Sequence, residues 1–131
     1  RPGNKQAHFQ LGNAYLRGKQ YGPALEQYKK AAEIDPIYIF PYINMGVIYM
    51  ETGRADEAIA TYEKILERYP SMAGAHKNLG MIYYKNKNEP PLALKHFEEA
   101  LRLEPTQPEA ALLRAIIARL RSELKTGAGA G

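Results

Sequence analysis

The chain has 131 residues, 45% of them hydrophobic and 24% charged, which is the size and composition of one ordinary folding unit. It has no cysteine and no apolar run of about 18 residues, which excludes disulfides, thiolate chemistry and a membrane-spanning helix. The net charge of +4 comes from 18 basic and 14 acidic residues that are interleaved along the chain. This pattern is typical of solvated helix faces and argues against a nucleic-acid partner.

The chain begins Arg1-Pro2-Gly3-Asn4, with neither an initiating methionine nor an apolar leader. We therefore expect a processed chain or part of a longer one. The composition leaves the compartment unknown. Cytoplasm is the default, and a periplasmic location or a membrane tether through a further segment is compatible with the sequence.

Three similar units follow one another along the chain. Leu11-Gly12 with Tyr15 is repeated 34 residues later by Met45-Gly46 with Tyr49, and after another 34 by Leu79-Gly80 with Tyr83. In each unit an alanine, an aromatic residue, an alanine or isoleucine and a proline come next: Ala24, Tyr28, Ala31 and Pro36; Ala58, Tyr62, Ile65 and Pro70; Ala93, Phe97, Ala100 and Pro105. The third unit is one residue longer, and we assign the extra residue to the turn over 85–91.

Helix signals divide each unit into two helices. Pro23 fits the opening turn of a second helix, Gly53 ends a first helix, and the prolines block continuation between units. A glycine inside a helix costs about 0.5–1 kcal/mol relative to alanine, so the three repeated glycines need a packing reason. We expect Ala24, Ala58 and Ala93 to lie opposite them, with the aromatic rings filling the space between successive pairs.

Residues 108–125 keep a helical spacing of apolar positions but lose the repeated residues. Ala115 stands where the glycine would be and Ala118 where the tyrosine would be. This segment is predicted to be a capping helix that covers the last unit with a polar exterior. We therefore expect a single domain over 1–125, with repeats at about 5–38, 39–72 and 73–107, and a flexible Gly/Ala tail over 126–131.

The recurring residues resemble those of the tetratricopeptide repeat family, a helix-turn-helix unit of 34 residues. The resemblance covers about Lys5 to Gln107. It implies an all-α fold of seven helices, a right-handed superhelical α-solenoid of antiparallel helix pairs. It also implies a module that binds a protein or peptide. Because the sequence has no nucleophile motif, phosphate-binding loop or zinc-binding spacing, we expect neither a cofactor nor enzymatic activity.

In this family one face of the first helix of each pair lines a concave groove. The predicted peptide-binding residues are Phe9, Gln10, Asn13, Phe40, Ile43, Asn44, Val47, Met50, Lys77, Asn78, Met81 and Tyr84. Asn44 and Asn78 are 34 residues apart, and their amides could pair with the backbone of an extended peptide or simply face water. The groove could hold an extended or helical segment of a partner, be covered by neighbouring units, or receive another copy of the chain.

Two alternative functions stay open at this point. One is a self-assembling structural protein, a homo-oligomer whose groove receives a neighbouring copy. The other is the recognition domain of a larger enzyme.

Family members that grip the C-terminal carboxylate of heat-shock chaperones use three cations and two asparagines. At the two asparagine positions this chain has Asn13 and Asn44, so both asparagines are present. At the three cation positions it has Phe9, Gly74 and Asn78, so all three cations are missing. We therefore expect no binding of such carboxylates, because the charge-assisted hydrogen bonds are lost. Lys77 is one residue away from the position of the missing arginine, and it is the only cation that could substitute for one of the three.

No motif for catalysis or for metal binding is found in the sequence. His8 and His76 stand at equivalent positions two units apart, which predicts a separation of about 20 Å. Each is expected to fill a large core position. His96 has no carboxylate or thiol at ligand spacing.

Overall fold

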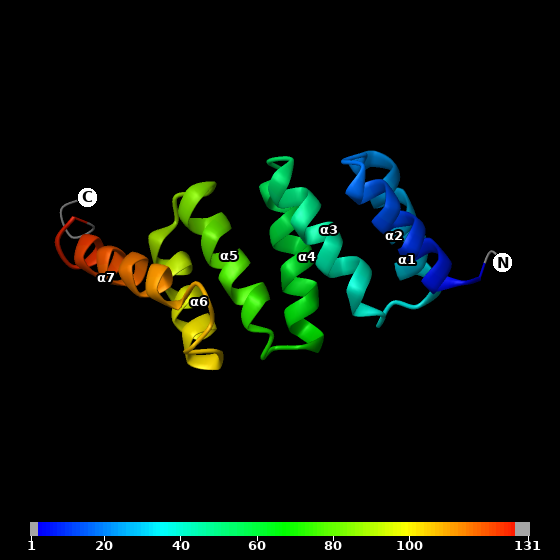
Figure 1. Cartoon of the computed structure of the whole chain (residues 1–131). Helices are drawn as coiled ribbons and strands as arrows, with labels where there is room; N and C mark the ends of the chain where they lie inside the picture. Colours follow the sequence, from blue (N-terminus) through cyan, green and yellow to red (C-terminus); the bar gives the residue numbers. More distant parts are fainter. Residues whose placement is uncertain (1–2, 128–131) are drawn as a thin grey trace. The chain divides into compact units, whose positions relative to one another are not determined.

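The computed structural model describes residues 3–127. Within that range the chain forms seven α-helices and no strand, which confirms the all-α prediction (Figure 1). The helices are α1 (Lys5–Arg17), α2 (Tyr21–Ile34), α3 (Ile39–Glu51), α4 (Ala55–Arg68), α5 (Ala73–Lys85), α6 (Pro90–Leu103) and α7 (Ala110–Thr126). They divide into two compact units, unit 1 with α1–α4, ending at Arg68, and unit 2 with α5–α7, beginning at Tyr69.

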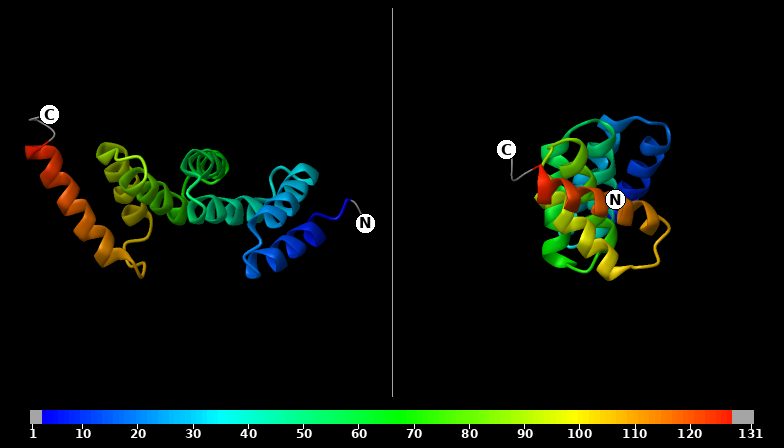
Figure 2. Two further views of the ribbon diagram at one scale, coloured as in Figure 1. Left: turned by 90° about the horizontal axis from the view of Figure 1, so that it is seen from above. Right: turned by 90° about the vertical axis from the view of Figure 1, so that its left-hand side faces the viewer.

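Unit 1 consists of two antiparallel helix pairs, α1 with α2 and α3 with α4, and α2 packs against α3 (Figure 2). Asn4 starts α1 by accepting a hydrogen bond from the Ala7 backbone N–H at 3.0 Å, which satisfies one of the free donors of the first turn. The core contains Tyr28, Ile48 and Tyr62, each at most 2% exposed. Burying side chains of this size contributes about 1.5–3 kcal/mol each, so the helix pairs are held together mainly by these contacts.

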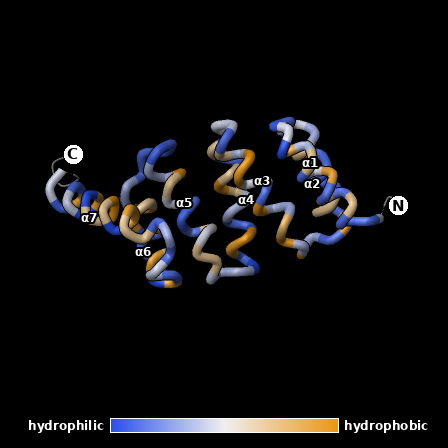
Figure 3. The backbone as a smooth tube through the Cα atoms, in the orientation of Figure 1, coloured by the Kyte–Doolittle hydropathy of each residue, from blue (hydrophilic) through white to orange (hydrophobic). Residues whose placement is uncertain are grey.

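Unit 2 consists of the α5/α6 pair and of α7, which packs on α6. Phe97 of α6 is completely buried, and Leu113 and Leu120 of α7 are each 1% exposed. Hydrophobic and hydrophilic residues alternate along α7, in accord with one buried and one exposed side (Figure 3). The helix includes Thr126, which the sequence assigns to the tail, and residues 128–131 of that predicted tail lie outside the described residues.

The repeated glycines are explained by aromatic rings rather than by the alanines that the sequence predicts. A Cβ atom on Gly46 would lie 2.6 Å from Cζ of Tyr62, closer than real Cβ contacts allow. Gly12 stands in the same relation to Tyr28, and Gly80 to Phe97. The rings therefore pack inside their own helix pair, where the prediction put them between successive pairs.

The turns between the two helices of each pair share one backbone feature. Lys19, Gly53 and Asn88 all have a positive φ, of 57°, 74° and 50°. The Gln20 N–H donates to the Tyr15 carbonyl at 2.9 Å, and the Arg54 N–H donates to the Tyr49 carbonyl at 2.8 Å, so both helices end in the same way. Four residues separate α5 from α6, where three separate the earlier pairs, which places the extra residue in the predicted turn.

No helix within residues 3–127 is both long enough and apolar enough to cross a membrane.

Candidate functional site

The predicted groove residues of unit 1 lie on α1 and α3, and none of them is buried. Phe9, Asn13, Ile43, Asn44, Val47 and Met50 are half-buried, and Gln10 and Phe40 are exposed. Phe40 is 53% exposed, which is unusual for a phenylalanine in a folded domain. We call the eight residues together the unit 1 face.

A hydrogen-bonded network of two amides and a phenol lies at the centre of this face. The Asn44 Nδ2 donates to Asn13 Oδ1 at 3.0 Å and to the Tyr28 hydroxyl at 3.2 Å. The Tyr28 hydroxyl in turn donates to Asn13 Oδ1 at 2.6 Å. Within residues 3–127, the Asn13 Nδ2 and the Asn44 Oδ1 have no hydrogen-bond partner. Because no buried side-chain nitrogen or oxygen in this range lacks a partner, both atoms are accessible, and the network presents one donor group and one acceptor outward.

The position of Tyr28 keeps its hydroxyl protonated. Burial raises the pKa of Tyr28, while the hydrogen bond from Asn44 and the charge of Arg17 act in the opposite direction. Because the phenol keeps its proton, it donates to Asn13 and fixes the orientation of that amide.

An aromatic cluster lies beside the network. The Phe9 ring is 5.8 Å from that of Tyr28, 5.7 Å from that of Tyr38 and 6.2 Å from that of Phe40. Tyr38 meets Phe40 edge to face at 5.7 Å. Such ring pairs stabilise each other beyond the area they bury, so the cluster is a firm apolar surface next to polar amides.

The charges at the edge of this cluster neutralise each other. Lys5 forms an ion pair with Asp35, and its Nζ lies 4.9 Å above the centre of the Tyr38 ring. The hydrogen bond from Lys5 lowers the pKa of Asp35. Neither Lys5 nor Asp35 therefore places an unpaired charge at the edge of the aromatic cluster.

The predicted groove residues of unit 2 all lie half-buried on α5. Lys77 donates to Glu109 at 3.1 Å and lowers the pKa of that carboxyl group, so its charge is already paired. Tyr84 meets Phe97 edge to face at 6.3 Å. Asn78 takes part in interactions inside the chain, and Met81 lies next to Gly80 in the sequence.

Sequence reasoning missed two residues of this site, Tyr28 and Tyr38. The repeat assigns Tyr28 to packing alone, although a buried tyrosine hydroxyl usually finds a hydrogen-bond partner, a signal that could have placed it. Tyr38 is the residue before α3, outside the helical periodicity, and no sequence signal marks it.

His8 and His76, which the sequence predicts to fill core positions, are only half-buried. His8 is half-buried, and its Nδ1 lies 2.8 Å from Gln27 Oε1. His76 of α5 and His96 of α6 meet with their Nδ1 atoms 3.1 Å apart, and the His76 Nε2 donates to the Pro70 carbonyl at 3.0 Å. No group of three or more potential metal ligands gathers within residues 3–127.

Comparison with known sequences gives two family matches. Residues 39–103 match the family profile described as "Tetratricopeptide repeat", and residues 12–53 match a second one described as "TPR repeat". Photosystem I assembly protein Ycf3 of Prochlorococcus marinus is 36% identical over 86 residues, which cover 62% of this chain and 50% of that protein. The chain thus spans half the length of this curated relative.

Solved structures of the same architecture cover nearly the whole chain. The N-terminal domain of stress-induced protein-1 from C. elegans superposes with a TM-score of 0.78 at 29% identity, over 89% of this chain and 94% of that domain. The first TPR domain of Spaghetti (RPAP3), solved with an HSP90 peptide, gives a TM-score of 0.80 at 23% identity, over 92% and 96%. With its helix pairs, its repeated residues and these matches, the chain belongs to the tetratricopeptide repeat family.

Proposed function

We propose that this chain is a protein-interaction module, an adaptor or assembly scaffold that holds an extended segment of a partner protein on the unit 1 face. The observation that carries the proposal is the Asn13–Asn44 pair, which presents a donor and an acceptor outward. An extended peptide backbone offers the complementary pair of groups at every residue, whatever its side chains are. The exposed Phe40 ring beside the amides would cover an apolar side chain of the same segment.

Two of the matched proteins support this function. Ycf3 is named as an assembly protein, and the Spaghetti domain was solved with a bound peptide. The proposal assigns this chain no catalytic step.

The chemistry of the residues narrows the class of partner. Phe9 and Gly74 occupy positions where carboxylate-binding relatives have cations, and the Lys77 charge is paired with Glu109. A terminal carboxylate would therefore lose the charge-assisted bonds that make such contacts strong. The proposed ligand is an internal, uncharged segment with an apolar side chain.

A selection experiment with displayed random peptides tests the proposal. Peptides that bind the wild-type chain would be measured by fluorescence anisotropy against Asn44→Ala and Phe40→Ala. We expect each substitution to weaken binding about tenfold, since each removes one contact of roughly 1–1.5 kcal/mol. Asn86→Ala and Leu92→Ala are the matched controls, because both replace exposed residues of unit 2 and should leave the affinity unchanged.

Thermal unfolding of each variant shows whether it is still folded. If the selected peptides bind the Asn44→Ala and Phe40→Ala variants as tightly as the wild type, the site is wrong. Light scattering over a concentration series tests the alternative of self-assembly. A stable oligomer without affinity for any peptide would favour that alternative.

A further inference from the structure

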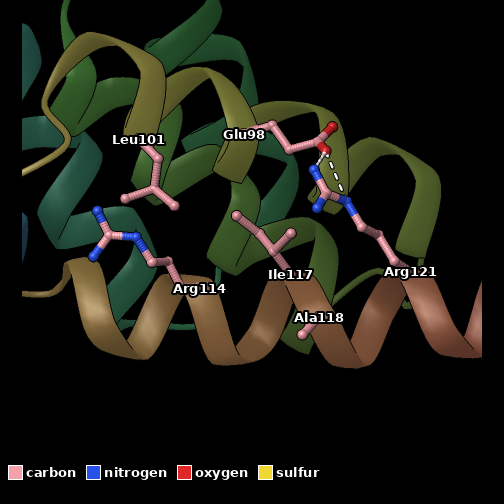
Figure 4. A pocket seen from close by; sticks show the side chains of 6 residues that line it. All are labelled: Glu98, Leu101, Arg114, Ile117, Ala118 and Arg121. Atoms are coloured by element: carbon pink, nitrogen blue, oxygen red, sulfur yellow. Dashed lines mark hydrogen bonds and ion pairs between the residues drawn. The ribbon is translucent and has the colours of Figure 1, made fainter.

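A shallow pocket of about 230 Å³ lies between α6 and α7, in unit 2 (Figure 4). Its walls are formed by Glu98, Leu101, Arg114, Ile117, Ala118 and Arg121. Leu101 and Ile117 form an apolar floor between the Arg114 guanidinium on one side and the Arg121–Glu98 ion pair on the other (Figure 4). This volume is below the usual range of small-molecule sites and suits one large side chain.

The internal repeat shows what such a surface normally holds. Counted 35 residues along the chain, Arg114 corresponds to Leu79, Ala115 to Gly80, and Ala118 to Tyr83. The three residues of α5 are buried beneath α6, whereas the three residues of α7 are exposed. Within residues 3–127, the face of α7 that corresponds to a helix-covered face has no helix on it.

Unit 1 contains the same surface with its helix in place. Lys29, Ala32 and Met45 correspond to Glu98, Leu101 and Arg114, and they line a similar hollow. There a third wall comes from Lys64 of α4, the helix that packs on α3. The residues that line the α6/α7 pocket come from these two helices alone, so no third helix contributes a wall to it.

We propose that this pocket and the adjoining face of α7 bind an acidic amphipathic helix of a partner protein, independently of the unit 1 face. Charge favours such a helix, because Glu98 offsets only Arg121, with which it forms an ion pair, so the charge of Arg114 leaves the pocket residues with a net charge of +1. One second helix of this chain has the same character, since α4 has four acidic and two basic residues, whereas α2 and α6 each have equal numbers of acidic and basic residues.

At two positions α7 differs from the repeat, and these two residues indicate which side chains the bound helix must have. Ala115 replaces the glycine that makes room for a ring, so a helix with Tyr62 at this place would clash with the Ala115 Cβ atom. Ala118 replaces a tyrosine, which leaves the pocket free for a large side chain from the partner. The bound helix therefore has a small residue opposite Ala115 and a large apolar one next to it.

A designed peptide with the sequence of residues 55–68, carrying Thr61→Leu and Tyr62→Ala, is the probe. Thr61 corresponds to His96, the residue that stacks on Tyr83, so a leucine there would enter the space next to Ala118. We expect this peptide to bind the full chain, in fluorescence anisotropy, at least tenfold more tightly than the unmodified α4 sequence. The affinity should fall as the salt concentration rises, because the contacts are partly ionic.

Ala118→Glu should weaken binding at least tenfold, and Ala60→Glu, the same change at an exposed helix position of unit 1, should not. Arg121→Ala should weaken binding several-fold at low salt. Its control is Arg119→Ala on the same helix, because Arg119 pairs with Glu123 and does not line the pocket. Circular dichroism shows whether each variant is folded. If Ala118→Glu does not fold, the comparison of Arg121→Ala with Arg119→Ala still tests the proposal.

Three outcomes would overturn the proposal: no binding of the designed peptide, equal binding of the unmodified one, or insensitivity to both pocket substitutions. Light scattering adds a fourth. If the chain alone forms a dimer that Ala118→Glu dissociates, the surface belongs to a second copy, and a partner helix is the wrong occupant. Failure of this test leaves the unit 1 face unaffected, since none of these residues belongs to it.

Discussion

The three repeated glycines and the three rings packed on them act as matched pairs of residues. Gly46 sits in the middle of α3, where alanine would favour the helix, and the Tyr62 ring occupies the space that a side chain would need. The intrinsic cost of a helical glycine is thus offset by the burial of an aromatic ring that is 2% exposed.

Gly46→Ala is expected to lower the free energy of unfolding by about 1–2 kcal/mol, because the overpacking of Tyr62 outweighs the gain in helix propensity. Gly74→Ala is the matched control. Gly74 is also helical, but it is exposed and no atom lies within 4 Å of the place that a Cβ atom would take, so a gain of about 0.5 kcal/mol is expected. Urea denaturation measures both. A Gly46→Ala variant as stable as the wild type would mean that the ring moves aside at no cost.

The His76–His96 pair links α5 to α6 through a hydrogen bond that needs at least one unprotonated Nδ1. Burial lowers the pKa of His96 from 6.5 to about 4, with smaller contributions in the same direction from the charges of His76 and Lys95, while Glu99 acts in the opposite direction. The His96 ring also stacks on Tyr83 of α5, with the centroids 5.8 Å apart. At neutral pH the pair is uncharged at His96 and intact.

Acidification should destabilise the fold through this group. Between pH 6.5 and about 4 the unfolded chain binds a proton at His96 that the folded chain does not, so the free energy of unfolding falls as the pH falls. With allowance for solvent screening of a half-buried ring, the loss between pH 7 and pH 5 is about 1 kcal/mol.

Urea denaturation of the wild type and of His96→Gln at the two pH values measures this contribution, since the carboxyl groups titrate in both proteins. The variant should lose less stability than the wild type on going to pH 5. Equal losses would show that His96 does not contribute to the pH dependence.

At the scale of the elements, each helix pair depends on a tight turn with one residue in the left-handed region. Only the second turn has glycine there, Gly53, whereas the first has Lys19 and the third Asn88. A side chain in this region costs about 1–2 kcal/mol, with asparagine tolerated better than lysine. The first turn is therefore the strained one.

Lys19→Gly should raise the free energy of unfolding by about 0.5–1 kcal/mol. Removing the backbone strain stabilises the folded state, and the greater entropy that glycine gives the unfolded chain offsets only part of this gain. The reverse change in the second turn, Gly53→Ala, should lower it by about 1 kcal/mol, since nothing within 4 Å blocks a Cβ atom there and only the backbone conformation opposes it. Thermal unfolding followed by circular dichroism measures both. Shifts of the same sign in the two variants would contradict this account of the turns.

The elements themselves could largely be predicted from the sequence. Repeated residues at a spacing of 34, together with Gly53 and the prolines, indicate where helices end, because each of these residues has few allowed conformations. The partners of those residues could not be predicted in the same way. The sequence matches Gly46 with the wrong class of residue, because a repeat shows which positions recur and not which of them face each other.

At the scale of the whole molecule, membership of a repeat family means that the helices of each unit pack mainly against their neighbours in sequence. Interactions of this kind make stability a sum of local terms, and each repeat can vary its exposed residues without loss of the fold. In unit 1 the variable positions contain amides and aromatic rings. In α7, Arg114, Ala115 and Ala118 stand at the positions that correspond to Leu79, Gly80 and Tyr83. Function in such a protein resides in these variable positions.

The candidate site could also be predicted only in part from the sequence. Helical geometry predicts which residues of one helix share a face, and the family resemblance implies that the faces with Asn13 and Asn44 line the same groove. The sequence does not predict that the two amides bond to each other or that the Tyr28 hydroxyl orients them, since these contacts join three different helices.

The sequence by itself therefore determined the fold class and the repeat, because these depend on local conformational preferences and on a periodic pattern. Only the tertiary structure decided which groups are already paired and which remain available. Asn13 and Asn44 each keep a free group, whereas Lys77 is paired with Glu109. Hydrogen bonds and ion pairs form at distances of about 3 Å, a precision that only the packed arrangement of the helices fixes.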